Sequence, residues 1–254
     1  MIAFYQTEWQ GIPFSDFAEV SSTKLAGPEF YDAFYRALFK KYSDYESLDA
    51  GWRSNKDEIT DWLAALFPDG ARVLSVGCGL GYMEQRLWRK HRDRIELHVQ
   101  DYASESLRWL RQLMPAAHIH DVEKDGSDKK AQRELYDLVF LSVMDYALAD
   151  DDLIGLLSQT RASLREDGQT IIISASFLDE TRGQSIVRSG KDAVKWLLDS
   201  LGLRKRGQFW GWVRSRAEYQ AILRAAGYAS VTDGFLVTPH QRTYWIKGKG
   251  VAEA

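Results

Sequence analysis

The chain has 254 residues, 45% hydrophobic and 27% charged, a composition typical of a globular protein with one large domain or a core domain and a cap. Its formal charge of -3 argues against non-specific binding to nucleic acid, which needs many cationic contacts to phosphates. The single cysteine excludes an internal disulfide, and neither a membrane-spanning apolar run nor a secretion signal is recognisable, so the cytoplasm is the expected compartment.

Residues 1–55 are rich in aromatic side chains and are predicted to form a helical cap. The spacing of Phe30, Phe34 and Leu38 predicts a helix over residues 28–41, and a second helix is expected over 56–66. The aromatic side chains either pack as core or enclose a substrate, and Tyr31 and Tyr35 are the candidates for substrate contact.

The most informative segment is residues 73–82, VLSVGCGLGY. Four residues typical of a buried strand are followed by Gly77, Gly79 and Gly81, and then by the start of a helix. Glycines at such a turn allow unusual backbone dihedrals and close approach of a ligand. A loop of this kind between a parallel strand and a helix N-terminus indicates a nucleotide-type cofactor site.

A second strand is expected over residues 95–101 and ends at Asp101, about twenty residues after the glycines. A carboxylate at this offset is suited to bind ribose hydroxyls, and a cap of the helix expected over 104–113 is the alternative role for Asp101. The dinucleotide fingerprint requires its third glycine three residues after the second, where this chain has Tyr82. A nicotinamide-dependent oxidoreductase is therefore disfavoured.

Strands and helices continue to alternate through residues 57–175, which predicts a parallel sheet covered by helices on both faces. Strands are expected over 118–121, 136–143 and 170–174, and a closing hairpin over 231–236 and 243–247. Between them lie a polar loop, an amphipathic helix over 192–201, the aromatic segment 207–213 and a last helix over 217–226.

In this order, the glycine loop, the acid at Asp101 and the later strands resemble the motifs of the class I S-adenosylmethionine-dependent methyltransferases over residues 56–249. The resemblance implies a doubly wound α/β fold with a mostly parallel seven-stranded sheet and an antiparallel C-terminal hairpin. The cofactor-binding domain would span 56–254, with a substrate-facing insertion at about 177–214. One position departs from the family: Ser75 stands where Asp or Glu is common, and Glu84 is the candidate replacement.

The implied cofactor is S-adenosylmethionine, and Asp121 would meet its adenine amino group. Arg53 and Lys56 either contact its methionine carboxylate or are exposed. The complete set of expected cofactor-binding residues is Ser75, Gly77, Cys78, Gly79, Gly81, Tyr82, Asp101, Tyr102, Asp121, Val122, Leu141 and Ser142.

A hydroxyl acceptor would need a base, for which Asp145 is the first candidate and His240 the second; each is otherwise an ordinary loop residue. Trp210, Trp212 and Arg214 alternate along a short strand. Flat aromatic faces suit a sugar or planar heterocycle and arginine suits a phosphate or carboxylate, with core packing as the alternative.

Tyr146 completes the candidate substrate contacts. The expected function is methyl transfer to a hydroxyl of a small-molecule or glycan acceptor, with N-methylation of a small amine or a non-catalytic cofactor-binding subunit as alternatives. No nucleic-acid partner is expected, and a homodimer is left open. No metal site is predicted either, because of the five histidines only His118 and His120 are close in sequence.

Overall fold

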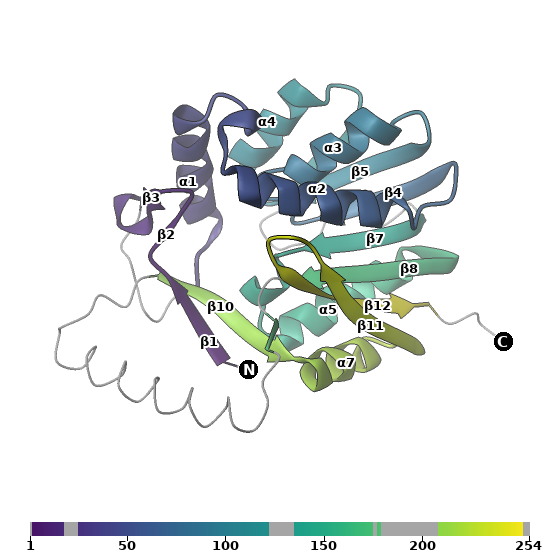
Figure 1. The fold of residues 1–254 in the computed structure, drawn as a ribbon. Coiled ribbons are helices and arrows are strands. Elements are labelled where there is room, and N and C mark those ends of the chain that lie inside the picture. Colours follow the sequence, from purple (N-terminus) through teal and green to yellow (C-terminus); the bar gives the residue numbers. More distant parts are fainter. Residues whose placement is uncertain (1, 18–24, 122–134, 175–176, 179–207, 251–254) are drawn as a thin grey trace.

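The computed structural model describes residues 2–17, 25–121, 135–174, 177–178 and 208–250, and a seven-stranded sheet forms its centre (Figure 1). The strand order is β11-β12-β8-β7-β4-β5-β6. These strands are β4 (Ala71–Val76), β5 (Ile95–Asp101), β6 (His118–Asp121), β7 (Tyr136–Ser142), β8 (Leu164–Ser174), β11 (Ser230–Val237) and β12 (Arg242–Lys249).

Strands β4 to β8 pair in parallel, whereas β12 runs antiparallel to β8 and β11 antiparallel to β12. The doubly wound sheet and antiparallel hairpin expected from the sequence are therefore confirmed. Strand β4 lies between β5 and β7, so the strand order reverses beside β4. In open sheets of this type, such a reversal opens a crevice at the carboxyl ends of the strands.

Helices cover both faces of the sheet (Figure 1). On one face α2 (Ala50–Ala64), α3 (Tyr82–His91) and α4 (Ser104–Leu113) pack against side chains such as Val73 and Val99. On the other face α5 (Asp150–Ala162) and α7 (Arg216–Ala225) pack against Leu74 and Ile172. Neighbouring residues of a strand point to opposite faces, so each strand serves both layers. No helix in the described ranges is long and apolar enough to cross a membrane.

The N-terminal region combines strands with the expected helix. Strand β1 (Ile2–Gln6) pairs antiparallel with β10 (Gln208–Ser215), which also pairs with β9 (Phe177–Leu178). A small hairpin of β2 (Glu8–Trp9) and β3 (Ile12–Pro13) follows, and α1 (Pro28–Lys41) has the bounds predicted from its aromatic spacing. The N-terminal segment is thus joined to the C-terminal half of the chain through the pairing of β1 with β10.

The predicted boundary between residues 55 and 56 falls inside α2, which begins at Ala50. The Asp49 side chain accepts a hydrogen bond of 2.7 Å from the Trp52 amide and so caps the helix at its N-terminus. The first buried residue of the helix is Asn55, so the apolar pattern alone does not indicate this earlier start. The helix expected over 192–201 and most of the insertion at 177–214 lie outside the described residues. Only β9 and β10 represent that insertion here.

Candidate cofactor and acceptor site

A cavity of about 600 Å³ lies at the carboxyl ends of β4, β5 and β7. The residues that follow or end these strands, Gly77, Asp101 and Ser142, all line it. Its remaining walls come from α1, α2 and the region around β10, so the N-terminal segment closes over the crevice of the sheet.

The glycine loop contributes backbone to the cavity wall. Gly79 and Gly81 have φ angles of 56° and 73°, in the left-handed region that favours glycine, and Gly81 is the N-cap of α3. A Cβ at Gly81 would lie 2.2 Å from Leu110 Cδ2, and one at Gly79 would lie 2.9 Å from the Tyr35 hydroxyl. Both dihedrals and space therefore require glycine, and no side chain from these two positions fills the cavity.

Asp101 is oriented by the same loop. Its Oδ2 accepts a hydrogen bond of 2.7 Å from the Gly79 amide, and its Oδ1 accepts one of 2.8 Å from the Ala103 amide. Burial raises the pKa of this carboxyl, while the two amide bonds act in the opposite direction. Each carboxylate oxygen retains a further acceptor site, so Asp101 is equipped to bind hydroxyl donors in the cavity.

Glu84 also reaches the cavity, from the first turn of α3. The Ser75 hydroxyl donates a hydrogen bond of 2.6 Å to Glu84 Oε1. Burial raises the pKa of Glu84 to about 7, and the bond from Ser75 partly offsets this effect.

Lys56 enters the cavity from α2, and its Nζ donates to Ser142 Oγ at 3.4 Å. Burial lowers the pKa of Lys56 to about 8, although the nearby Glu84 favours the charged form. Glu84 and Lys56 are thus an acid and an amine of the cavity whose charged forms are both disfavoured by burial. A ligand carrying an ammonium and a carboxylate would complement both groups.

One wall of the cavity is aromatic. Tyr31 lies 5.8 Å from Tyr102 and 5.5 Å from Trp210 between ring centroids, and Tyr146 stacks on Trp210 at 6.0 Å. Burial raises the pKa of Tyr31 and Tyr146 above the ordinary phenol value. Their hydroxyls therefore stay protonated and can donate hydrogen bonds beside flat apolar surfaces.

Comparison with known proteins identifies the family. A family model described as a methyltransferase domain matches residues 51–233. The chain belongs to the methyltransferase-domain family. The match covers the glycine loop, the whole parallel part of the sheet and β10, so the family resemblance seen in the sequence is confirmed.

Solved structures of methyltransferases share the fold at low sequence identity. A Nostoc punctiforme protein assigned as an O-methyltransferase aligns over 91% of this chain and 63% of its own, with a TM-score of 0.58 and 16% identity. Magnesium protoporphyrin IX methyltransferase from Synechocystis, with bound SAH, aligns over 88% of this chain and 97% of its own (TM-score 0.57, 14% identity).

Human N-acetylserotonin methyltransferase, in complex with SAM, aligns over 89% of this chain (TM-score 0.53, 17% identity). The chain spans 63% of the Nostoc punctiforme protein and 57% of the human enzyme. At these identities the similarity establishes the fold alone. No match was found among curated proteins.

The structure brings most of the expected methyltransferase residues to the cavity. Those that line it are Gly77, Cys78, Gly79, Gly81, Tyr82, Asp101, Tyr102, Ser142, Tyr31, Tyr35, Tyr146 and Trp210. Ser75 and Leu141 are buried and do not line it: Ser75 lies behind Glu84, and Leu141 belongs to the core facing α5.

Asp121 does not reach the cavity either. Its exposed side chain accepts a hydrogen bond of 2.8 Å from Arg111, on the surface beside α4. Val122 lies outside the described residues. Of the two cations weighed for the methionine carboxylate, Lys56 lines the cavity, whereas Arg53 Nε donates to the Leu48 carbonyl.

Asp145, the first candidate for a base, is fully buried away from the cavity lining. Its Oδ2 accepts hydrogen bonds from Ser174 and Tyr219, and burial raises its pKa. Arg214 is fully buried as well. It donates to the Asp145 carbonyl and the Asp150 carboxylate at 2.8 Å each, so it ties the turn after β7 to β10 rather than facing an acceptor.

Trp210 and Trp212 were expected to share one face of the strand, but they do not both face the cavity. Trp210 lines it, whereas Trp212 packs edge-on against Phe209 with ring centroids 5.1 Å apart. The strand pairing is irregular opposite Phe4 and Tyr5, and Gly211 has a φ of 140°. A regular alternation of side chains cannot be extended through such a bulge.

His240, the second candidate base, is exposed and does not line the cavity, although Gln241 and Thr243 just after it do. Residues that the sequence interpretation did not propose also contribute. Trp9, Phe34, Trp52 and Asn55 line the cavity from the N-terminal segment. The aromatic composition of this segment could have indicated Trp9, Phe34 and Trp52 as lining residues. Nothing in the sequence indicates Asn55 or Gln241, because only the tertiary fold brings these two residues to the cavity.

Proposed function

We propose that this chain transfers a methyl group from S-adenosylmethionine to a hydroxyl of a small-molecule acceptor, such as a sugar, a glycan end or a natural-product scaffold. The observation that carries the proposal is the continuity of one cavity. The glycine loop and Asp101 line the same space as Tyr31, Tyr146 and Trp210. Its volume of about 600 Å³ lies in the range of small-ligand sites.

The residues present fit the cofactor. The glycine loop presents backbone without side chains, and a Cβ at Gly79 would close the gap to the Tyr35 hydroxyl. We assign the ribose hydroxyls to Asp101, whose two oxygens are already aimed by backbone amides. We assign Glu84 to bind the ammonium of the cofactor's methionine moiety and Lys56 to bind its carboxylate. Burial disfavours the charged form of each side chain, and an opposite charge on the ligand would stabilise it.

S-adenosylmethionine supplies a methyl group on a sulfonium, which is an already activated carbon. The main task of the protein is then to hold the acceptor oxygen in line with that carbon and to exclude water. The aromatic walls formed by Tyr31, Tyr146 and Trp210 suit a flat or ring-shaped acceptor, and the protonated tyrosine hydroxyls can orient its polar groups. Neither Asp145 nor His240 lines the cavity, so we assign no general base and attribute catalysis to the positioning of the acceptor oxygen.

The test combines calorimetric titration with S-adenosylmethionine and a turnover assay that measures the demethylated cofactor and the mass of the product. Phenols, sugars and amines of matched size serve as acceptors, each beside an analogue whose reactive atom is already methylated. We expect tight binding and product formation only with free hydroxyls. Products from amines alone would replace the proposal with N-methylation, and tight binding without turnover on any acceptor would favour a non-catalytic subunit.

A further inference from the structure

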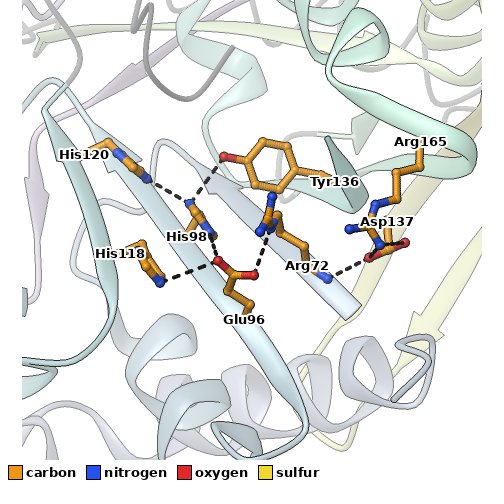
Figure 2. A network of polar contacts seen from close by, with 8 residues as sticks. All are labelled: Arg72, Glu96, His98, His118, His120, Tyr136, Asp137 and Arg165. Atoms are coloured by element: carbon orange, nitrogen blue, oxygen red, sulfur yellow. Dashed lines mark hydrogen bonds and ion pairs between the residues drawn. The ribbon is translucent and has the colours of Figure 1, made fainter. Parts of the chain in front are cut away.

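Histidine side chains from β5 and β6 gather around Glu96 at a place separate from the cavity (Figure 2). Glu96 and His98 are two residues apart on β5, so their side chains leave the same face of the sheet. The parallel register places His118 of β6 directly beside His98. In the sequence, only His118 and His120 are close neighbours, and both lie on β6. Glu96 and His98 join them from β5, the adjacent strand.

Three potential ligand atoms converge there. His98 Nε2 lies 3.1 Å from Glu96 Oε1, and His118 Nε2 lies 3.6 Å from the same oxygen. The three atoms all lie within 4.8 Å of one another. Zinc ligands at about 2.0–2.2 Å from the metal are separated by roughly 3–4 Å. The His98 and His118 rings are stacked with centroids 4.4 Å apart, so the exposed His118 side chain has to turn out of this stack to direct its nitrogen lone pair at the same ion as His98.

We propose that Glu96, His98 and His118 form a binding site for one divalent transition-metal ion, with Zn²⁺ as the best match. Two imidazole nitrogens and one carboxylate oxygen are donors that suit zinc and neighbouring first-row metals, and they are less suited to calcium or magnesium. The sequence did not predict this site, because His98 and His118 are twenty residues apart along the chain. Water would complete the coordination on the open side, where the His118 side chain is 54% exposed.

Groups behind the ligands hold them in position (Figure 2). Arg72 Nε donates to Glu96 Oε2 at 2.9 Å, which leaves Oε1 turned toward the histidines. His98 Nδ1 lies 2.9 Å from His120 Nε2 and 3.4 Å from the Tyr136 hydroxyl. A metal-binding histidine commonly has its second nitrogen hydrogen-bonded in this way, because the bond fixes the tautomer that presents a lone pair to the metal.

The position of the site indicates its effect. Among the described strands, β6 is an edge strand of the large sheet and pairs only with β5. It is four residues long. An ion held between His98 and His118 would cross-link these two strands, three residues before Asp101 at the end of β5. We therefore expect the ion to stabilise the fold without taking part in methyl transfer.

The test uses the 254-residue chain without a tag, stripped of metal with a chelator. Binding of Co²⁺ is followed by its visible absorption, and Zn²⁺ affinity is measured by competition with a chromophoric chelator. We expect one ion per chain and a higher melting temperature with Zn²⁺ than without it. His118→Ala and Glu96→Gln should each weaken Zn²⁺ binding by at least about tenfold, and His120→Ala by about ten- to a hundredfold.

His240→Ala is the matched control, because His240 is an exposed histidine outside the cluster; this variant should bind like the unaltered chain. Melting curves of the metal-free variants show whether each is folded, and His118 is exposed enough to be replaced without opening the core. Unchanged Zn²⁺ affinity in His118→Ala and Glu96→Gln, or no binding by the unaltered chain, would overturn the proposal. Neither metal affinity nor melting temperature depends on methyl transfer, so failure of the metal-site proposal would leave the proposed methyltransferase activity untouched, and the reverse.

Discussion

The Ser75 hydroxyl, on β4, donates a hydrogen bond of 2.6 Å to the Glu84 carboxylate in the first turn of α3. The strand position where the resembled family commonly has an acid holds a serine, and a carboxylate from the following helix occupies the adjacent space. Glu84 lines the cavity and Ser75 does not, so the carboxylate presented to the cavity comes from the helix, nine residues after Ser75.

Asp101 provides the first prediction. Asp101→Ala should weaken S-adenosylmethionine binding by about ten- to a hundredfold, since hydrogen bonds to a charged group contribute roughly 1.5–3 kcal/mol. Calorimetric titration measures the change. Asp121→Ala is the control, because Asp121 is exposed and bonded to Arg111 away from the cavity. Equal affinity of both variants would contradict the ribose assignment.

Glu84 should make cofactor binding depend on pH. Its pKa is about 7 in the free protein, and the ionised form is the one proposed to attract the cofactor ammonium. As the pH falls below about 7, Glu84 becomes protonated, and affinity should drop by up to about tenfold per pH unit. Titrations between pH 5 and 7.5, a range chosen around roughly that pKa, measure the slope.

Glu84→Gln is the matched variant for this test. It should bind more weakly at pH 7.5 and show a flat profile over the same range, because the amide has no proton to gain. An equally steep profile in Glu84→Gln would assign the titration to another group.

Gly81 should tolerate no side chain. Gly81→Ala places an L-residue at a φ of 73° with its Cβ 2.2 Å from Leu110, so the free energy of unfolding should fall by about 1–3 kcal/mol or more. Gly155→Ala is the control, because it lies in α5 with nothing within 4 Å of the added Cβ. That change should be neutral or stabilising by up to about 1 kcal/mol, measured by urea unfolding.

Arg214 should matter for stability and not for acceptor choice. Arg214→Met leaves the buried carbonyl of Asp145 without its partner and the partly exposed Asp150 carboxylate without its ion pair, and should lower the free energy of unfolding by about 1–3 kcal/mol. The KM for the acceptor, measured at a temperature where the variant is folded, should stay close to that of the unaltered chain. A stable variant with a raised KM would return Arg214 to the acceptor site.

Trp210 should affect acceptor binding. Trp210→Leu removes a flat wall that contacts Tyr31 and Tyr146, and should raise the KM for the acceptor by about tenfold, a loss of roughly 1.4 kcal/mol, with cofactor affinity nearly unchanged. Trp212→Leu on the same strand is the control, because Trp212 does not line the cavity. Equal effects of the two substitutions on the acceptor KM would argue against the aromatic wall.

Local patterns in the sequence were sufficient for the sheet and the cofactor loop. Gly77, Gly79 and Gly81 specify a turn through backbone dihedrals, and the residues of α1 specify a helix through their spacing, so both could be predicted without tertiary contacts. The position of Asp101 beside the glycine loop could also be predicted, because parallel strands bring their carboxyl ends to one edge of the sheet.

The acceptor side and the histidine cluster were decided only by the tertiary structure. Arg214 and Asp145 carry charges that suit catalysis in a sequence, yet the fold buries both: Arg214 donates to the Asp145 carbonyl, and Asp145 Oδ2 accepts from Ser174. His98 and His118 are twenty residues apart along the chain and become neighbours through strand register alone. Periodicity and turn chemistry act over a few residues, whereas these groupings depend on which strands pair and where a bulge interrupts them.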